Sequence, residues 1–270
     1  MQLGVLITLG NDVEKEFKKV SENGFACCQL CCWDAKLFTV ETADLVNECC
    51  KKYNVKVTTF WCGWSGPAVW DFYEGPLTLG LVPTEYRWMR IKELMKGADF
   101  AKKIGVVNVA THLGFIPETP NTAEYTSLVC AVRTLAQYIK ENGQYFLLET
   151  GQETPVTMRR LIEDVGTGNM GVNFDSANLI LYGKANPLDA LDVFGEYVRE
   201  MHAKDGCYPT DGKNLGKETP IGQGKVDFPK IIKKLKDIGY TGAVTIEREI
   251  SGEEQLKDII AAKKYLEGLM

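Results

Sequence analysis

Eight short apolar segments recur along the chain, and each is followed by a stretch with the apolar spacing of an amphipathic helix. The predicted strands are residues 3–8, 26–32, 55–62, 106–112, 145–150, 170–175, 198–205 and 242–248. The predicted helices are residues 12–22, 40–53, 85–104, 122–142, 155–165, 187–195, 227–238 and 252–268. Repeated strand–helix units give parallel strands with right-handed crossovers, and eight such units close into a barrel. The sequence therefore predicts an α/β fold, a single-domain (β/α)8 TIM barrel spanning residues 1–270.

Four predicted helices are followed by a glycine before the next strand, namely Gly24, Gly105, Gly143 and Gly239. Glycine is the usual C-terminal cap of a helix, so these positions support the boundaries. Two connections, residues 63–84 and 206–226, are long and follow strands. Both therefore belong to the C-terminal face of the barrel, where barrel enzymes build their sites, and we expect them to act as lids or binding loops.

The overall charge is mildly acidic, since 31 basic and 36 acidic residues give a net charge of −5. This balance argues against nucleic acid as a partner, because phosphate neutralisation needs a basic patch. The N-terminal stretch has no basic start, and acidic residues soon follow its apolar part. It predicts neither a signal peptide nor a membrane span, so we expect a cytoplasmic protein that does not bind membranes.

Nine cysteines are present, and Cys28 and Cys31 form a C-x-x-C pattern within a predicted strand. Residues three apart on a strand point to opposite faces and cannot share a tetrahedral metal. We interpret the cysteines as reduced side chains that act as small core residues, with a zinc or redox role as the alternative.

Four consecutive predicted strands each carry one metal-ligating residue type near the C-terminal end: Glu149, Asp175, His202 and Glu247. Apolar neighbours such as Met201, Ala203 and Ile246 should face the outer helices, so these four should point inward. Each acid alone could be a helix cap or surface group, and His202 alone a core histidine. Four such residues on adjacent strands are hard to explain separately, especially since the chain has only two histidines, and they favour a shared site.

Three carboxylates converging with an imidazole would repel one another unless a cation neutralised them. The sequence therefore predicts one divalent metal ion. Oxygen-rich ligand sets favour harder ions, so Mn²⁺ is the first expectation, with Co²⁺, Mg²⁺ or Zn²⁺ as alternatives.

Five motifs carry a resemblance to a known family: LETG at 148–151, NFDSANL at 173–179, HAKD at 202–205, GQGKVDF at 222–228 and TIERE at 245–249. The chain resembles the xylose isomerase-like TIM barrel superfamily, the sugar phosphate isomerase/epimerase family, which also contains inosose dehydratases. The motifs cover the C-terminal half, and the N-terminal half matches in architecture alone. The resemblance implies a small-molecule sugar substrate, with Glu149, Asp175, His202 and Glu247 as metal ligands. Barrels of this family often pair through loops of the site face, which leaves a homo-oligomer open.

The chain departs from the family pattern at two places. Ketose 3-epimerases of the family usually have a histidine where Asn178 stands, and a substrate-binding arginine near the segment 207–209. These departures argue against a free-ketohexose 3-epimerase. Two histidines are also too few for the three-zinc centre of the family's DNA-repair branch, which excludes a nuclease.

A metal between two glutamates indicates proton abstraction next to a carbonyl. The metal would act as Lewis acid, one of Glu149 and Glu247 would remove the carbon-bound proton, and an enediolate would form. The first hypothesis is a sugar isomerase or epimerase. The second is a lyase at the same site, which dehydrates an inosose or eliminates the aglycone of a keto-glycoside. The third is a barrel that only binds a sugar.

Further substrate contacts are predicted at His112, Lys204, Asn178, Trp61 and Trp33, with Trp64 near the two tryptophans. The alternatives are a structural role for His112, a solvated lysine at the rim, and an aromatic plug under residues 63–84. No arginine cluster at the mouth demands a phosphate.

Three other features bear on the predicted register. Glu200 lies two residues before His202 on the same predicted strand, so its side chain should also face the barrel interior, where an unpaired carboxylate is costly. Either a bulge intervenes or the carboxylate has an interior partner. Glu153 is interpreted as a helix cap, because Pro155 then begins a helix. The glycines Gly222 and Gly224 predict a turn that closes the second long loop rather than a dinucleotide-binding loop, because no helix opens directly after a strand there.

Overall fold

Eight parallel strands close into a barrel at the centre of the computed structural model, which describes all 270 residues. The strands are β1 (Gln2–Thr8), β2 (Cys27–Cys32), β3 (Lys56–Cys62), β4 (Asn108–Thr111), β5 (Tyr145–Glu149), β6 (Met170–Asp175), β7 (Val198–Ala203) and β10 (Ala243–Ile246). Each pairs with its neighbours in chain order, and β10 pairs with β1 to close the barrel. This confirms the predicted (β/α)8 fold.

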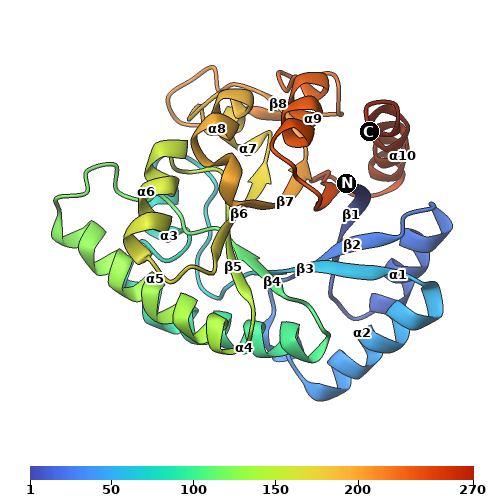
Figure 1. Cartoon of the computed structure of the whole chain (residues 1–270), viewed down its shortest axis with the longest axis horizontal. Helices are drawn as coiled ribbons and strands as arrows, with labels where there is room; N and C mark the ends of the chain where they lie inside the picture. The colour runs from blue at the N-terminus through green and yellow to red at the C-terminus, as the bar shows by residue number, and fades with distance from the viewer.

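Helices surround the barrel (Figure 1). The α-helices are α1 (Val13–Glu22), α2 (Val40–Tyr53), α3 (Gly75–Thr78), α4 (Thr84–Lys103), α5 (Ala123–Glu141), α6 (Pro155–Val165), α7 (Asn178–Leu181), α8 (Pro187–Phe194), α9 (Phe228–Asp237) and α10 (Glu253–Glu267). Two 3-10 turns, η1 (Ala35–Leu37) and η2 (Gly195–Tyr197), complete the helical elements. The eight predicted helices are all present, with ends shifted by at most one residue.

Local signals explain the helix boundaries. The side chain of Thr39 accepts a hydrogen bond from Thr42 N and caps α2, and Thr122 caps α5 through Tyr125 N. Such caps satisfy N–H groups that have no partner within the helix. The four predicted glycine caps all have left-handed backbones, with φ between 69° and 76°. A side chain is strained in that conformation, so glycine ends these helices at low cost.

The core has two parts. The larger one fills the space between strands and outer helices and contains the phenylalanines Phe17, Phe60, Phe100, Phe146 and Phe174. The smaller one lies inside the barrel and consists of Cys31, Trp61, Trp64, Leu79, Ala110 and Leu147.

The cysteines behave as the strand parity predicts. Cys28 belongs to the outer core and Cys31 to the inner one, so the two side chains do not share a ligand site. All nine cysteines are free thiols. Most of them are buried, whereas Cys130 is exposed, so the interpretation as core residues does not extend to that position.

Polar side chains form a layer inside the barrel below the inner core. Glu200 is buried there, and its carboxylate accepts hydrogen bonds from Gln29 Nε2 at 3.4 Å, Asn108 Nδ2 at 3.3 Å and Thr58 Oγ1 at 3.4 Å. The β6–β7 register also shifts between Val172 and Asn173. Both alternatives predicted for Glu200 are therefore present: the strand register is irregular beside it, and its carboxylate has hydrogen-bond partners inside the barrel.

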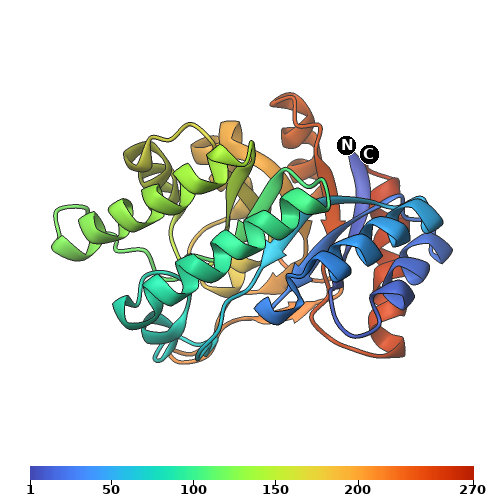
Figure 2. The same ribbon diagram turned by 90° about the horizontal axis from the view of Figure 1, so that it is seen from below.

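Both long connections lie on the side of the barrel away from the chain ends, as Figure 2 shows. The segment 63–84 contains α3, and the segment after β7 contains an antiparallel hairpin of β8 (Asp205–Cys207) and β9 (Lys217–Thr219). These short elements were not predicted. Three predicted strands also end early, so that His112, Lys204 and Glu247 lie just beyond β4, β7 and β10.

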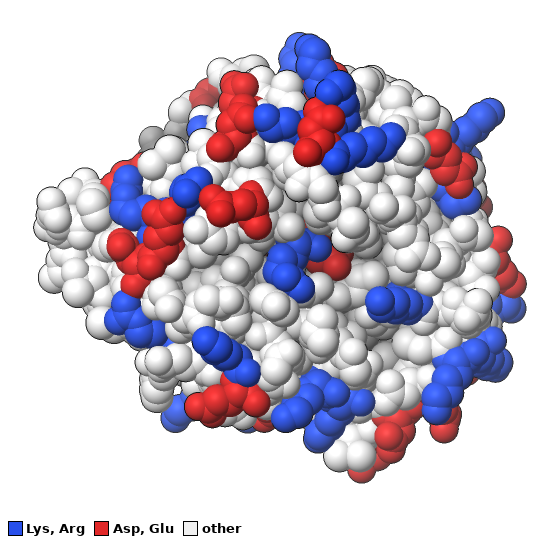
Figure 3. All heavy atoms as spheres, in the orientation of Figure 1, with Lys and Arg blue, Asp and Glu red and all other residues white.

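None of the helices combines the length and the apolar character that crossing a membrane would require. On the face shown in Figure 3, acidic and basic side chains are mixed, and no continuous basic patch is visible there.

Candidate metal centre

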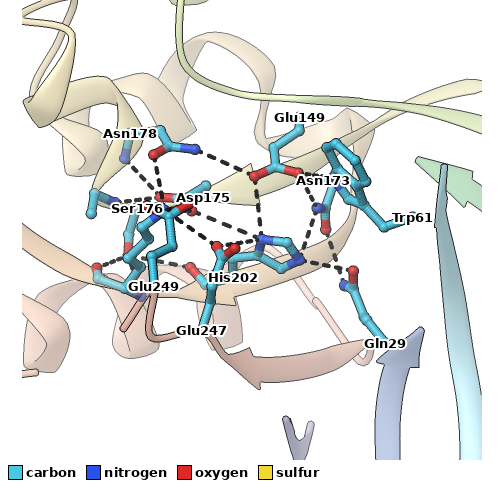
Figure 4. Close-up of polar contacts among 12 residues, drawn as sticks. Gln29, Trp61, Glu149, Asn173, Asp175, Ser176, Asn178, His202, Glu247 and Glu249 are labelled. Atoms are coloured by element: carbon cyan, nitrogen blue, oxygen red, sulfur yellow. Dashed lines mark hydrogen bonds and ion pairs between the residues drawn. The ribbon is translucent and has the colours of Figure 1, made fainter. Parts of the chain in front are cut away.

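Four side chains meet where β5, β6, β7 and β10 end: Glu149, Asp175, His202 and Glu247. One ligand atom from each lies within 4.8 Å of all the others. The first three are buried, and the Glu247 side chain is 11% exposed. Figure 4 shows the carboxylates on one side of the His202 ring. The structure thus brings together the four residues that the sequence singled out, and the arrangement could hold one metal ion.

Asp175 is oriented by the backbone that follows it. Its Oδ1 accepts hydrogen bonds from Ala177 N at 2.8 Å and Asn178 N at 2.7 Å, where the chain enters α7. These bonds immobilise one carboxylate oxygen and leave Oδ2 facing His202 Nδ1 at 3.8 Å. The one-turn helix α7 therefore aims Asp175 into the site.

The ring of His202 has distinct surroundings at its two nitrogens. Nδ1 faces the carboxylates, 3.0 Å from Glu247 Oε2 and 3.3 Å from Glu149 Oε1. Nε2 lies 2.8 Å from Gln29 Oε1 on the opposite side of the ring (Figure 4). Nε2 also lies 3.2 Å from Asn173 Nδ2, but its contact with the Gln29 oxygen is shorter. An amide oxygen only accepts, so this shorter contact favours the neutral ring with its hydrogen on Nε2 and its lone pair on Nδ1. Gln29 therefore selects the tautomer that can ligate a metal through Nδ1.

The donor set fits a divalent cation. Asp175 Oδ2, His202 Nδ1 and Glu247 Oε2 are buried and close together, yet none is aligned for a hydrogen bond. Polar atoms buried without a partner each cost about 1–3 kcal/mol, and more when charged. A cation between them would satisfy all three atoms at once, and three oxygen donors with one nitrogen suit the harder divalent ions.

Burial and neighbouring charges act against each other in this cluster. Burial raises the pKa of Asp175 well above its usual value. At Glu247 burial has the same tendency, but the charges of Lys204 and His202 outweigh it and lower the pKa. Burial lowers the pKa of His202, but Glu149 and Glu247 outweigh it and raise that pKa well above 6.5. A proton on His202 thus supplies positive charge that a bound cation would replace.

Besides His202 and Asn173, whose Nδ2 donates to Oε2 at 3.4 Å, three neighbours hold Glu149. Trp61 Nε1 donates to Oε2, Asn178 Nδ2 donates to Oε1 at 3.3 Å, and His112 Nε2 lies 3.5 Å from Oε1. Burial disfavours the carboxylate, but the charges of His112 and His202 outweigh it and lower the pKa of Glu149. The carboxylate is therefore oriented and kept ionised.

A cavity of about 350 Å³ opens over these residues. Its lining residues are Leu6, Cys31, Trp33, Trp61, Trp70, His112, Glu149, Asn178, Leu181, Tyr182, His202, Leu215, Glu247 and Glu249. Such a volume lies within the range of small-molecule sites. Four of the predicted substrate contacts, at His112, Asn178, Trp61 and Trp33, line this cavity.

Lys204, the fifth predicted contact, is buried behind the cavity wall rather than solvated at the rim. Its Nζ lies 2.8 Å from Glu249 Oε1 and 3.5 Å from Glu247 Oε2. These acids outweigh burial and raise its pKa well above 10.5, so Lys204 is charged.

Sequence reasoning missed Gln29, Glu249 and Trp70. Gln29 is the one polar residue in the strand sequence CCQLCC, and a polar side chain in a strand buried on both faces could have indicated an interior role. Glu249 follows Glu247 by two residues, and in an extended chain such residues point to the same side, which could have indicated that Glu249 also faces the site. Nothing in the sequence separates Trp70 from the other residues of its long connection.

The structure also tests the predictions made for Glu153 and for the turn around Gly222. The interpretation of Glu153 as a helix cap is wrong, because Thr154 caps α6 by accepting from Thr157 N, while Glu153 is buried and accepts from Gly151 N at 3.3 Å. A threonine next to the proline performs the capping role assigned to the glutamate. The turn predicted around Gly222 is present, and its N–H groups bind a carboxylate of the protein itself.

Comparison with known proteins places the chain in a family. Residues 17–268 match the family described as xylose isomerase-like TIM barrel, and the chain belongs to this family. A crystal structure of a xylose isomerase domain protein from Planctomyces limnophilus is 34% identical, covers 99% of this chain and 96% of its own, and superposes with a TM-score of 0.93.

Two other matches connect the chain with named activities. An inosose dehydratase of Lacticaseibacillus casei is 24% identical over 54% of this chain and 55% of its own length, so the chain spans about half of that relative. The 3-keto-D-glucoside 4-epimerase of E. coli is 18% identical, covers 99% of both chains and has a TM-score of 0.73, which shows a shared fold. The names of these two proteins specify a dehydration and an epimerisation of sugar-like substrates.

Proposed function

We propose that the protein is a divalent-metal-dependent sugar isomerase or epimerase that works by proton abstraction next to a carbonyl. The observation that carries this proposal is the pair of acids Glu149 and Glu247 on either side of His202 Nδ1, at 3.3 and 3.0 Å, under a cavity of sugar-like size. The named activities of the similar epimerase and dehydratase agree with such chemistry.

Glu149, Asp175, His202 and Glu247 would hold the metal, with Mn²⁺ as the first choice and Co²⁺, Mg²⁺ or Zn²⁺ as alternatives. When bound, the ion supplies Lewis-acid polarisation of a substrate carbonyl and so acidifies the neighbouring C–H group. The buried Gln29 keeps the His202 nitrogen free for this purpose.

The protein's own residues then move the proton. Glu149 and Glu247 both have lowered pKa values, so each can accept a carbon-bound proton as a carboxylate. Removal of that proton gives an enediolate. Return of a proton by the second glutamate from the opposite face gives the epimer, and return to the next carbon gives the isomer. General acid–base help of this kind contributes about 10²–10⁴ in rate.

Neighbouring residues orient the reacting groups. Trp61 and Asn178 fix the carboxylate of Glu149, so its oxygen meets the substrate in one position. Lys204 places a fixed positive charge 3.5 Å from Glu247 Oε2 and, from behind the cavity wall, favours negative charge on a substrate oxygen that lies beside Glu247. The aromatic side chains that line the cavity would displace water when a substrate is bound, which would strengthen these interactions.

A lyase is the second candidate, and Asn178 favours it. Family 3-epimerases usually carry a histidine at this position, whereas here an amide donates to Glu149 Oε1. The same proton abstraction becomes an elimination when the group on the next carbon leaves with a proton. His112 lines the cavity 3.5 Å from Glu149 and is placed to give that proton.

Exchange in heavy water tests the proposal. Protein loaded with Mn²⁺ is incubated in D₂O with keto-sugars and keto-glycosides, and products are followed by NMR and mass spectrometry. Deuterium gained next to the carbonyl without loss of water or aglycone supports the isomerase or epimerase. Loss of either group assigns the lyase. No exchange into any of these substrates, with metal bound, would contradict both.

A further inference from the structure

One wall of the cavity is built from tryptophans. Trp33 lies against Trp61, Trp64 and Trp70, with ring centroids 5.1, 5.2 and 6.3 Å apart. Trp61 and Trp64 are buried, but Trp33 is 41% exposed and Trp70 39% exposed. Large aromatic side chains left partly open beside a cavity indicate a surface that an apolar group covers.

This wall begins at the reacting groups. Trp61 donates its indole N–H to Glu149, and the Trp70 ring lies 5.4 Å from the ring of His112. The backbone is also adapted to the wall, because a Cβ on Gly63 would lie 2.5 Å from the Trp33 ring. Glycine at position 63 therefore leaves the space that Trp33 fills. A substrate whose reacting carbon is near Glu149 must extend along these rings.

Charge in the cavity disfavours an anionic substrate. No lysine or arginine lines it, whereas Glu149, Glu247 and Glu249 do. Together with Asp175 these make four carboxylates, and a divalent cation with Lys204 offsets three of the four charges. A sugar phosphate would bring about two more negative charges into a site that already has one in excess.

The buried Arg90, whose guanidinium lies over the ring of Trp64, is engaged with the backbone. Arg90 donates to the backbone oxygens of Thr78 at 2.8 Å, Gly80 at 2.6 Å and Pro67 at 2.9 Å. Its guanidinium holds the connection 63–84 in place and is not available to a phosphate.

Backbone N–H groups that could bind a phosphate are also occupied in one loop of the site face. Barrel enzymes often bind phosphate with backbone N–H groups of the loops after the seventh and eighth strands. Here the Asp205 carboxylate takes four N–H groups of the connection after the seventh barrel strand and accepts from Gly206 N at 2.8 Å, Gly222 N at 2.8 Å, Gly224 N at 2.9 Å and Val226 N at 3.1 Å. An internal carboxylate therefore occupies the anion-binding turn and shapes the hairpin β8–β9.

We infer that the substrate is an unphosphorylated sugar derivative with an apolar substituent, such as an aryl glycoside ring system, which lies on Trp33 and Trp70. The inference rests on the proposed function for the place of the sugar ring and adds the class of substrate. Leu181, Tyr182 and Leu215 complete an apolar lining for the substituent.

Equilibrium binding of glycosides that lack a carbonyl tests the inference without turnover. Binding of 4-nitrophenyl β-D-glucopyranoside, methyl β-D-glucopyranoside and methyl β-D-glucopyranoside 6-phosphate to the Mn²⁺-loaded protein is measured by titration calorimetry. We expect the aryl glycoside to bind at least about tenfold more tightly than the methyl glycoside. The phosphate should bind no more tightly than the methyl glycoside.

Variants locate the effect. Trp33→Ala and Trp70→Ala should each remove most of the aryl preference, whereas Trp88→Ala, at an exposed position of α4 outside the cavity, should leave it unchanged. Undetectable aryl binding, equal aryl and methyl affinities, a preference for the phosphate, or equal effects of all three variants would overturn the inference. Failure of the proposed function would show as absent deuterium exchange, a separate result that these binding ratios do not depend on.

Discussion

The hydrogen bond between Gln29 and His202 makes the role of a residue outside the ligand set testable. Gln29 Oε1 lies 2.8 Å from His202 Nε2 and fixes the ring tautomer whose Nδ1 faces the carboxylates. In Gln29→Leu this acceptor is lost, so the ring is free to carry its hydrogen on the nitrogen that should bind metal. Partners of metal-ligating histidines typically contribute 10–100-fold in metal affinity. We therefore expect Mn²⁺ binding to weaken by about 10–100-fold, or about 1.4–2.7 kcal/mol.

The same substitution has a cost in stability that must be separated from this effect. Gln29 Nε2 also donates to Asn173 Oδ1 at 3.2 Å and to Glu200 Oε2 at 3.4 Å. Loss of a donor to buried acceptors costs about 1–3 kcal/mol, so the metal-free variant should also unfold more easily. Asn108→Leu is a matched control, because Asn108 donates to Glu200 and to the backbone of Thr58 in the same layer without touching His202.

The assay is competition for Mn²⁺ with a chromophoric chelator, together with urea unfolding of the metal-free proteins. Gln29→Leu should lose metal affinity and stability, whereas Asn108→Leu should lose stability alone. Unchanged affinity in Gln29→Leu, or an equal loss of affinity in both variants, would refute the reasoning about the tautomer.

Three further predictions concern individual acids and the histidine. Glu247→Gln should lower turnover by at least about 10²-fold with an unchanged circular dichroism spectrum, and full activity would remove Glu247 from the proton-transfer steps. His202→Ala should lower the metal content found by elemental analysis, which an unchanged content would contradict. Burial raises the pKa of Glu153 to about 8 from a usual 4.5, so the folded state holds a proton that the unfolded state releases. Stability should therefore fall by about 1.4 kcal/mol per pH unit from about pH 5 to 7 relative to Glu153→Gln, and parallel pH profiles of the two proteins in urea unfolding would exclude this.

The fold was predictable because its signals are local. Each strand is a short apolar run, each helix repeats its apolar positions, and glycines such as Gly105 and Gly143 mark the helix ends. The positions of Glu149 and His202 followed from the same register, since parallel strands bring their carboxyl ends to one face.

The remaining features depend on contacts between distant segments. Gln29 meets His202 only because closure of the barrel through β1 and β10 brings the interior faces of β2 and β7 toward each other. The hairpin β8–β9 depends on Asp205 binding backbone N–H groups about twenty residues ahead, and no local pattern announces such a turn. The tryptophan wall depends likewise on how the connection 63–84 folds back, which places Trp70 beside Trp33.

The central claim is that side chains from four neighbouring strands share one cation. Anomalous diffraction at the manganese edge, from crystals grown with Mn²⁺, tests it most directly. The account predicts one strong peak enclosed by Glu149, Asp175, His202 and Glu247, with Nδ1 as the nitrogen ligand at about 2.0–2.3 Å. No peak at saturating Mn²⁺, or a peak elsewhere while these side chains face away from one another, would contradict it.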